Sequence, residues 1–224
     1  MQFVYHEQSG QSTLTIENES FIHLFKSRRT KVAHELFFRN LKDDNLYTYK
    51  VTEINKKDAI CELLYIKKDE KTKLKEFNLA WCIIEPKIIE KTLPTLNEIG
   101  VKKIIFIYSD FSQKNFKINF EKLKKILIYS CEQCGRADFM DIEVCDSIEE
   151  FMKKYRDFGV IDFSINKIDE FAYKQLKTWM IGCEGGFSKN EKEMLKNQKV
   201  LGFDTTNILK SESAAIAIAS KILL

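Results

Sequence analysis

A glycine-rich segment, residues 182–186, has the residue types best suited to holding a small molecule. It follows the short apolar run Thr178–Ile181 and contains three glycines within five residues. Glycine allows a sharp backbone turn and a close approach to a ligand. Ser188 and Glu191 then have the spacing of a capping box, which predicts the start of a helix. We therefore expect a buried strand, a tight turn and a helix N-terminus whose free N–H groups can bind a ligand. The alternative is an ordinary turn.

A second group of small and apolar residues lies farther along the chain. Leu201-Gly202-Phe203 ends another short apolar segment. From Asn207 the sequence predicts a C-terminal helix, which is apolar on almost every side between Ala214 and Ala219. A helix that is apolar all round is normally buried, so we expect this helix to lie in the core.

Three blocks of this region together resemble the RsmE family, the bacterial SPOUT-class methyltransferases of small-subunit ribosomal RNA. Gly182–Ser188 is similar to the family's Gly-Pro-Glu-Gly-Gly-Phe-Ser loop, with Cys183 in place of proline. Leu201-Gly202 is similar to its Leu-Gly turn. Ile208–Ala214 is similar to its Ile-Leu-Arg-Thr-Glu-Thr-Ala helix start, with Lys210 in place of arginine. The resemblance runs in ordered blocks from about residue 80 to the C-terminus, and it is weaker in the residues before 80.

Two upstream segments extend the resemblance, and two others depart from it. Glu132–Arg136 is similar to the family's Glu-Gln-Ser-Gly-Arg, and Glu98–Val101 is similar to its Glu-Leu-Gly-Val. Asp110–Gln113 stands where the family has an arginine-containing segment, and Thr95 stands where it has a basic residue. We therefore expect RNA contacts at these two places to have shifted to neighbouring lysines.

The resemblance implies S-adenosylmethionine (SAM) as the cofactor, bound at the glycine-rich segment. The implied cofactor-binding positions come from the three C-terminal blocks and the strand before them: Ile181, Gly182, Glu184, Gly185, Gly186, Leu201, Gly202, Ile208 and Leu209. For Leu201, Ile208 and Leu209 the alternative is a place in the apolar core.

The implied reaction is transfer of a methyl group to N3 of a specific uridine in 16S ribosomal RNA. The proton on this nitrogen must be removed or the resulting anion stabilised. The candidate catalytic residues are Lys210, Arg136 and Glu212. Lys210 could stabilise the anion or hold a phosphate, and Arg136 could do so from a partner subunit. Alternatively, the two cations are surface charges at helix ends and Glu212 only caps its helix; the general base stays unassigned.

Other readings of the C-terminal region remain open. A SPOUT methyltransferase acting on tRNA or on a ribose hydroxyl would carry its motif near the start of the α/β region, where none is found. A catalytically inactive RNA-binding protein of the same fold is disfavoured by the intact glycine loop. An unrelated two-domain α/β protein is the remaining possibility. The first strand of the α/β region is not followed by Gly-x-Gly-x-x-Gly, and the sequence has no Walker loop, which removes the two commonest nucleotide-binding motifs.

The first 66 residues read mostly as short strands at close spacing, which favours a small β-barrel. Strands are expected at Thr13–Ile16, Glu35–Arg39, Leu46–Ile54 and Ala59–Ile66, and a short helix at Phe21–Phe25. This arrangement resembles the PUA-like domain of the family. Residues 1–75 hold 14 Lys and Arg against 11 Asp and Glu, whereas the remaining residues are balanced at 22 each. The implied RNA-binding residues form a basic cluster after the first strands: His23, Lys26, Arg28, Arg29 and Lys31.

From Leu79 the chain alternates between strand and helix patterns, which is typical of an α/β fold with a parallel sheet. Strands are predicted at 79–84, 101–108, 142–144, 159–163 and 178–181. A helix should begin near Pro86 and end at Gly100, although Pro94 predicts a kink or a later start. An amphipathic helix is expected over 119–134. Ligands of such sheets bind at the carboxyl ends of the strands, where the glycine-rich segment lies.

The short strands of the first 66 residues and the strand–helix alternation from Leu79 together predict a fold with two domains. Residues 1–70 are expected to form the PUA-like β-barrel, and residues 71–224 a SPOUT methyltransferase domain, with the charged stretch Lys67–Glu76 as linker or exposed strand end. The resemblance alone implies a C-terminal trefoil knot and a homodimer, because sequence pattern shows neither. It also implies 16S rRNA or the 30S subunit as the macromolecular partner.

Composition sets the remaining limits. The chain has 224 residues and is 44% hydrophobic, enough for a packed core. No apolar run reaches the roughly 20 residues of a membrane span, and no signal peptide is visible, so we expect a cytoplasmic protein without membrane contact. Six cysteines are present, and only Cys131 and Cys134 form a C-x-x-C pair. Without a second pair we expect core thiols and no metal site.

Overall fold

The computed structural model describes residues 3–68, 76–168 and 175–224. The chain divides into two compact units. The N-terminal unit comprises Met1–Thr72 and Ile128–Phe139, and the α/β unit comprises Lys73–Leu127 and Met140–Leu224. The predicted linker Lys67–Glu76 and the predicted boundary at residue 70 fall largely in the segment 69–75, outside the described residues.

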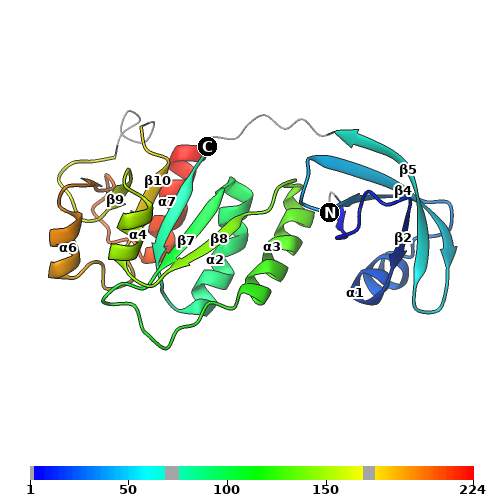
Figure 1. The fold of residues 1–224 in the computed structure, drawn as a ribbon, viewed down its shortest axis with the longest axis horizontal. Coiled ribbons are helices and arrows are strands. Elements are labelled where there is room, and N and C mark those ends of the chain that lie inside the picture. The colour runs from blue at the N-terminus through cyan, green and yellow to red at the C-terminus, as the bar shows by residue number, and fades with distance from the viewer. Residues whose placement is uncertain (1–2, 69–75, 169–174) are drawn as a thin grey trace. The chain divides into compact units, whose positions relative to one another are not determined.

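The N-terminal unit is built on a five-stranded sheet with the order β1-β3-β4-β5-β2. Figure 1 labels β2, β4, β5 and α1 of this unit. Its elements are β1 Val4–Tyr5, β2 Thr13–Ile16, α1 Asn18–Phe21, the π-helical segment η1 Ile22–Ser27, β3 Glu35–Arg39, β4 Asn45–Ile54 and β5 Ala59–Lys68. The predicted strands are confirmed, and the predicted helix lies within α1 and η1. Within residues 3–68 no ladder joins β1 to β2, so backbone pairing does not close the expected barrel.

The core of this unit follows from alternation along the strands. In β2, Leu14 and Ile16 are fully buried, while Thr13 and Thr15, which alternate with them, are exposed. These side chains meet Phe38 of β3, Tyr49 of β4 and apolar residues of η1 in one cluster. Apolar burial of this kind contributes roughly 25 cal/mol per Å² and holds the helical segment against the sheet.

The α/β unit contains a six-stranded sheet in which every ladder is parallel, with the order β11-β9-β10-β6-β7-β8. Its elements are β6 Asn78–Cys82, α2 Pro86–Ile99, β7 Lys103–Ile107, the first part of α3 Phe120–Cys134, β8 Asp141–Cys145, α4 Ile148–Lys154, β9 Gly159–Ile161, β10 Thr178–Ile181, α6 Lys189–Leu195, β11 Lys199–Leu201 and α7 Ser211–Leu223. From Ile128 onward, α3 belongs to the N-terminal unit. The mixed α/β fold and the predicted strands are confirmed.

Helix α2 corrects one expectation and confirms another. The helix begins at Pro86 and runs without interruption through Pro94, so the alternative of a later start is wrong. Burial of Leu93 and Leu96 outweighs the single hydrogen bond that a proline removes. Gly100 ends the helix in the left-handed conformation, with φ of 104°, as a C-terminal glycine should.

Helix α7 begins later than its sequence predicts. Lys210 is extended, with ψ of 158°, and the helix starts at Ser211 instead of near Asn207. The helix packs against α2 and against strands β10 and β6. Ala214, Ala215 and Ile218 are buried, whereas the two residues that follow Ala215 are half-buried. The prediction that this helix is buried in the core is therefore only partly correct. The residues before Ser211 are therefore free to line a cavity.

Candidate functional site

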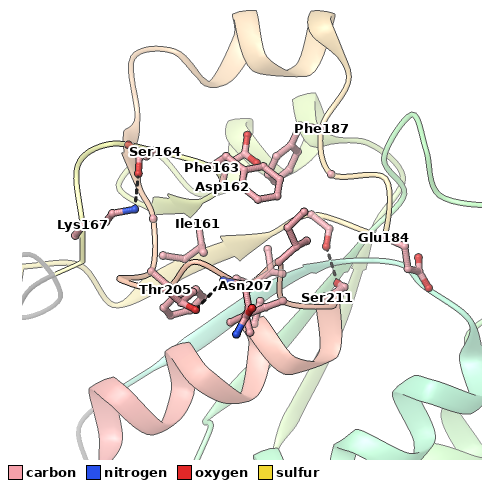
Figure 2. A pocket seen from close by; sticks show the side chains of 18 of the residues that line it. Ile161, Asp162, Phe163, Ser164, Lys167, Glu184, Phe187, Thr205, Asn207 and Ser211 are labelled. Carbon is pink, nitrogen blue, oxygen red and sulfur yellow. Dashed lines mark hydrogen bonds between the residues drawn. The ribbon is translucent and has the colours of Figure 1, made fainter.

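A cavity of about 640 Å³ lies where strands β9, β10 and β11 end at the carboxyl edge of the sheet (Figure 2). Three loops line it, one after each strand: 161–167 after β9, 181–187 after β10 and 202–211 before α7. Neighbouring parallel strands end at the same edge, so segments far apart in sequence meet there. We call this cavity the cofactor pocket.

Glycines let these loops approach one another. A Cβ on Gly202 would lie 2.8 Å from the carbonyl oxygen of Ser164, and a Cβ on Gly182 would lie 3.1 Å from the backbone of Gly186. Gly186 itself has φ of +70°, which side chains rarely adopt. Substitution at Gly202 or Gly182 would therefore push the loops apart, whereas at Gly186 the obstacle is backbone strain.

Ser211 ties the start of α7 to the glycine loop. Its buried hydroxyl donates a 2.6 Å hydrogen bond to the carbonyl oxygen of Gly182 (Figure 2). The same hydroxyl accepts a 2.8 Å hydrogen bond from the indole N–H of Trp81. Strand β6, the glycine loop and α7 are thus joined through one buried oxygen, which fixes the floor of the cofactor pocket.

The rim of the pocket exposes apolar side chains. Phe163 is 75% exposed, Ile165 94% and Ile208 78%. All three line the cavity together with polar groups such as Asn207. Large apolar groups left in water at a concave site are typical of a surface that a ligand covers. This lining suits a ligand with a flat apolar part and a few hydrogen-bonding groups.

The predicted capping box is present and also fixes a neighbouring loop. Ser188 accepts a hydrogen bond from the Glu191 N–H, and the Glu191 carboxylate accepts one from the Ser188 N–H at 2.8 Å. The other oxygen of Glu191 accepts a 2.7 Å hydrogen bond from the N–H of Asp110. Glu191 is buried, so it holds the loop after β7 against the start of α6.

Seven of the nine predicted cofactor residues line the pocket: Ile181, Gly182, Glu184, Gly186, Gly202, Ile208 and Leu209. Gly185 does not line it, because it faces the ring of Phe111 instead. Leu201 is buried behind the lining at the end of β11. The pocket thus brings together most of the predicted set from three separate blocks.

The three predicted catalytic residues are placed differently. Lys210 is exposed beside the pocket but does not line it. Glu212, in the first turn of α7, has one buried carboxylate oxygen without a hydrogen bond to any residue that the structure describes. Arg136 belongs to the N-terminal unit, where it is buried and paired with Asp138 through two nitrogen–oxygen contacts of 3.1 and 3.0 Å. Lys210 and Glu212 thus belong to the α/β unit and Arg136 to the N-terminal unit.

The five predicted RNA-binding residues are all exposed on η1 and the segment after it: His23, Lys26, Arg28, Arg29 and Lys31. Lys26 lies over the ring of Phe21, with its nitrogen 5.2 Å from the ring centre. Arg29 has φ of 58°, in the left-handed region. The cluster is a solvated basic surface of the N-terminal unit.

Pocket residues that sequence reasoning missed follow strands β9 and β11. They include Asp162, Phe163, Ser164, Phe203 and Asn207. They carry no motif, but the rule that ligands bind at the carboxyl ends of parallel strands would have indicated them.

Two of the cysteines are core residues, and none belongs to a metal-binding cluster in the described parts of the chain. No group of three or more His, Cys, Asp or Glu there has a geometry that could hold a metal ion. Burial raises the pKa of the Cys82 thiol, and burial raises the pKa of Cys61 to about 11. A protonated thiol is a poor nucleophile and a poor metal ligand, so these two side chains are core residues.

Comparison with known proteins identifies the class to which this fold and pocket belong. The family model described as an RNA methyltransferase domain matches residues 70–223, and that described as an RNA methyltransferase PUA domain matches residues 16–64. The fold is thus that of an RNA methyltransferase with an N-terminal PUA-like domain.

Full-length relatives narrow the class to one family. The chain is 44% identical to the ribosomal RNA small subunit methyltransferase E of Helicobacter pylori strain J99, over 98% of both chains. It is 25% identical to the protein of that name from Aquifex aeolicus, again over 98% of both. The chain belongs to the ribosomal RNA small subunit methyltransferase E family, which confirms the resemblance seen in the sequence.

Solved structures share the fold. A ribosomal RNA small subunit methyltransferase E from Neisseria gonorrhoeae, bound to SAM, matches with a TM-score of 0.79 at 19% identity, over 99% of this chain and 96% of that one. A methyltransferase from Legionella pneumophila in complex with SAM matches with a TM-score of 0.82 at 20% identity, over the same shares. None of the helices in residues 3–68, 76–168 and 175–224 is long and apolar enough to cross a membrane.

Proposed function

We propose that this chain is a SAM-dependent methyltransferase that methylates N3 of a specific uridine in 16S ribosomal RNA. The observation that carries the proposal is the cofactor pocket, in a chain 44% identical to a ribosomal RNA small subunit methyltransferase E along its whole length. The pocket joins three loops from separate parts of the chain, and two of them, 181–187 and 202–211, contain the family-like blocks.

The pocket residues fit SAM. Its volume lies within the range of small-molecule sites. Glycines at 182, 186 and 202 leave backbone groups accessible where any side chain would clash or strain. Ile208 and Leu209 supply an apolar surface for the adenine ring, and Glu184 supplies a negative charge that favours a positively charged sulfur. These residues would hold the cofactor.

When bound, SAM supplies a methyl group on a positively charged sulfur, which keeps the bonding electron pair when the methyl passes to the nitrogen. The chain must orient N3 of the uracil and deal with its proton. Lys210, beside the pocket, is proposed to stabilise the uracil anion or to hold the phosphate of the target nucleotide. Glu212 is proposed to support this region through its buried carboxylate. Arg136 keeps its proposed catalytic role from a partner subunit, which requires its pair with Asp138 to open.

RNA binding is proposed to begin at the PUA-like domain, with residues 1–70 and 71–224 as the two functional domains. The exposed basic cluster from His23 to Lys31 supports this placement, since phosphate contacts release counterions and supply most of the affinity. The trefoil knot, the homodimer, the cytoplasmic location and 16S rRNA or the 30S subunit as partner belong to the same proposal. For the knot, the support is that the chain after β11 returns to the glycine loop at Ser211.

The test is methyl transfer from labelled SAM to 16S rRNA, naked and in 30S subunits, followed by mass mapping of the product. A single N3-methylated uridine is the expected result. Cofactor binding without transfer to either substrate would overturn the rRNA assignment, and tRNA would be the next substrate. Failure to bind SAM would overturn the enzyme assignment altogether.

A further inference from the structure

A second, smaller hollow lies along the same edge of the sheet. Its volume is about 300 Å³, less than half that of the cofactor pocket. Its lining comes from the segments that follow β6, β7 and β10, and these three strands are neighbours in the order β10-β6-β7. The cofactor pocket uses the strands on the other side of β10. The two hollows therefore meet at the loop after β10.

One residue belongs to both hollows. Glu184 lines the cofactor pocket and the smaller hollow. In Figure 2 its side chain points away from the other labelled residues of the cofactor pocket. Its carboxylate makes no hydrogen bond or ion pair with any residue that the structure describes. A free carboxylate thus stands on the border between the two hollows.

The lining of the smaller hollow excludes an anion. Glu85, at the start of α2, supplies a second carboxylate to the lining, and the lining residues that the structure describes include no lysine or arginine. Two carboxylates repel a phosphate and favour groups that donate hydrogen bonds. A neutral ring with N–H groups fits, whereas a phosphate or the carboxylate end of SAM does not.

The hollow also offers a flat aromatic surface. Phe111 is 54% exposed and lines the hollow. Its ring lies against Gly185, where a Cβ would come within 3.1 Å of a ring carbon. Unstacked bases of RNA are commonly held on exposed aromatic rings. Gln113, also exposed in this lining, has an amide that can both donate to and accept from the edge of a base.

The loop that carries Phe111 is fixed by hydrogen bonds. The hydroxyls of Ser109 and Ser112 lie 2.9 Å apart, and Ser112 donates a 2.8 Å hydrogen bond to the carbonyl oxygen of Ile83. At the far end of the loop the Tyr108 hydroxyl donates a 2.7 Å hydrogen bond to the carbonyl oxygen of Phe116. Such a loop can present an aromatic ring in one place without a large ordering cost.

We propose that this hollow binds the flipped-out uracil of the target nucleotide, stacked on Phe111, with Glu184 accepting the N3 proton. The proposal rests on the proposed function and specifies where its substrate base lies. Uracil presents an N–H at N3, which a carboxylate accepts, whereas cytosine presents a lone pair there, which a carboxylate repels. Gln113 donates to a uracil carbonyl. The proton leaves N3 for the Glu184 carboxylate, and the nitrogen electron pair takes the methyl group across the shared border.

The test compares Phe111→Ala, Gln113→Leu and Glu184→Gln with the wild type in two assays: SAM binding by calorimetry and steady-state methyl transfer to 30S subunits. Phe120→Ala is the matched control, because Phe120 is 49% exposed and lies outside both hollows. Phe111→Ala should lower kcat/KM for RNA by about 10- to 100-fold, the usual effect of removing one stacking ring. Its SAM affinity should stay within about 2-fold.

One further variant, Gly185→Ala, and the Glu184→Gln variant separate positioning from folding. Gly185→Ala should lower kcat/KM for RNA without weakening SAM binding, because Gly185 faces Phe111 and not the cofactor pocket. Glu184→Gln should lower kcat, because an amide cannot accept the proton. SAM binding shows that Phe111→Ala, Gln113→Leu and Gly185→Ala are folded, and circular dichroism shows it for Glu184→Gln, because Glu184 also lines the cofactor pocket.

The outcomes are distinguishable. RNA-specific losses in Phe111→Ala, Gln113→Leu and Gly185→Ala, with Phe120→Ala like wild type, would support the proposal. Variants indistinguishable from Phe120→Ala would overturn it and leave the proposed function intact. A wild-type protein that binds SAM but methylates no rRNA would overturn the proposed function and this inference with it.

Discussion

The cofactor pocket and the basic surface of the N-terminal unit rely on opposite kinds of structure. The pocket depends on backbone geometry: glycines at 182, 186 and 202 and one buried serine decide its shape. The basic surface depends on exposed side chains from His23 to Lys31, which have charge but little fixed geometry. Single small changes should therefore abolish function at the pocket, whereas the surface should lose affinity by increments and in proportion to charge.

The largest effect is expected for Gly202→Val. The new Cβ would meet the carbonyl oxygen of Ser164 at 2.8 Å, so the loops after β9 and β11 must separate. We expect SAM to bind at least about 100-fold more weakly, roughly 3 kcal/mol, as measured by calorimetry. Gly186→Ala is the comparison, because its Cβ meets nothing within 4 Å and only backbone strain of about 1 kcal/mol remains. Equal binding by wild type and Gly202→Val would contradict the backbone account.

The next effect should appear at the basic surface. Replacing Lys26, Arg28 and Lys31 with glutamine should weaken RNA binding about 30-fold at 0.1 M salt and make the salt dependence shallower by about 2 to 3 in log–log slope. Arg29 is left in place because its backbone is left-handed. Filter binding at several salt concentrations measures both quantities.

The matched control for this charge change lies in the same unit. Lys56, Lys57 and Lys67 are equally exposed, and their replacement removes the same charge elsewhere. If both triple variants lose the same affinity and slope, the effect is net charge and not a binding surface. SAM affinity should stay unchanged in both.

A smaller loss is expected from Ser211→Ala. The change leaves the Trp81 indole N–H and the Gly182 carbonyl oxygen buried without their partner. We expect the free energy of unfolding, measured by urea unfolding, to fall by about 2 kcal/mol. SAM binding, measured by calorimetry, should be roughly 10-fold weaker. Ser213→Ala, exposed on the same helix, should change stability by less than about 0.5 kcal/mol. Equal stability of the two variants would show that Ser211 does not hold the loop.

The smallest effect concerns a charge that stabilises the α/β unit without belonging to either hollow. Burial raises the pKa of Glu143, but hydrogen bonds from Tyr155, Lys154 and Lys103 outweigh burial, and the net pKa is lowered. A carboxyl whose pKa is lowered by folding contributes stability above its unfolded pKa, and this contribution is lost as pH falls through the folded value. Glu143→Gln should therefore cost about 1 kcal/mol at pH 7, and this cost should shrink as the pH falls below about 4.3, the ordinary pKa of a glutamate. A pH-independent difference in urea unfolding would contradict this.

The sequence predicted local elements well where one short segment decides them. The capping box of Ser188 and Glu191 and the left-handed Gly100 depend on neighbouring residues alone, and both are present. Errors occurred where distant contacts decide. Pro94 does not delay α2, because the helix is held by its buried face, and α7 starts at Ser211, whose hydroxyl is bound to Gly182.

In the candidate site, too, the sequence predicted what short segments decide and failed where distant contacts decide. Three family-like blocks, identified from residue order alone, contain ten of the 21 residues that line the cofactor pocket. Gly185 and Leu201 belong to those blocks but do not line it, because one faces Phe111 and the other lies behind the lining. Which face of a block meets a cavity depends on neighbours that the block does not contain.

The sequence by itself determined the order of strands and helices, the glycine positions and the family, because these follow from local periodicity and residue identity. Only the tertiary structure decided that β10 stands between β9 and β6 in the sheet. That strand order places the loop of Glu184 on the border of two hollows and brings Phe111 against Gly185. The physical reason is that pairing between strands distant in sequence is set by packing of the whole core, which no short segment encodes.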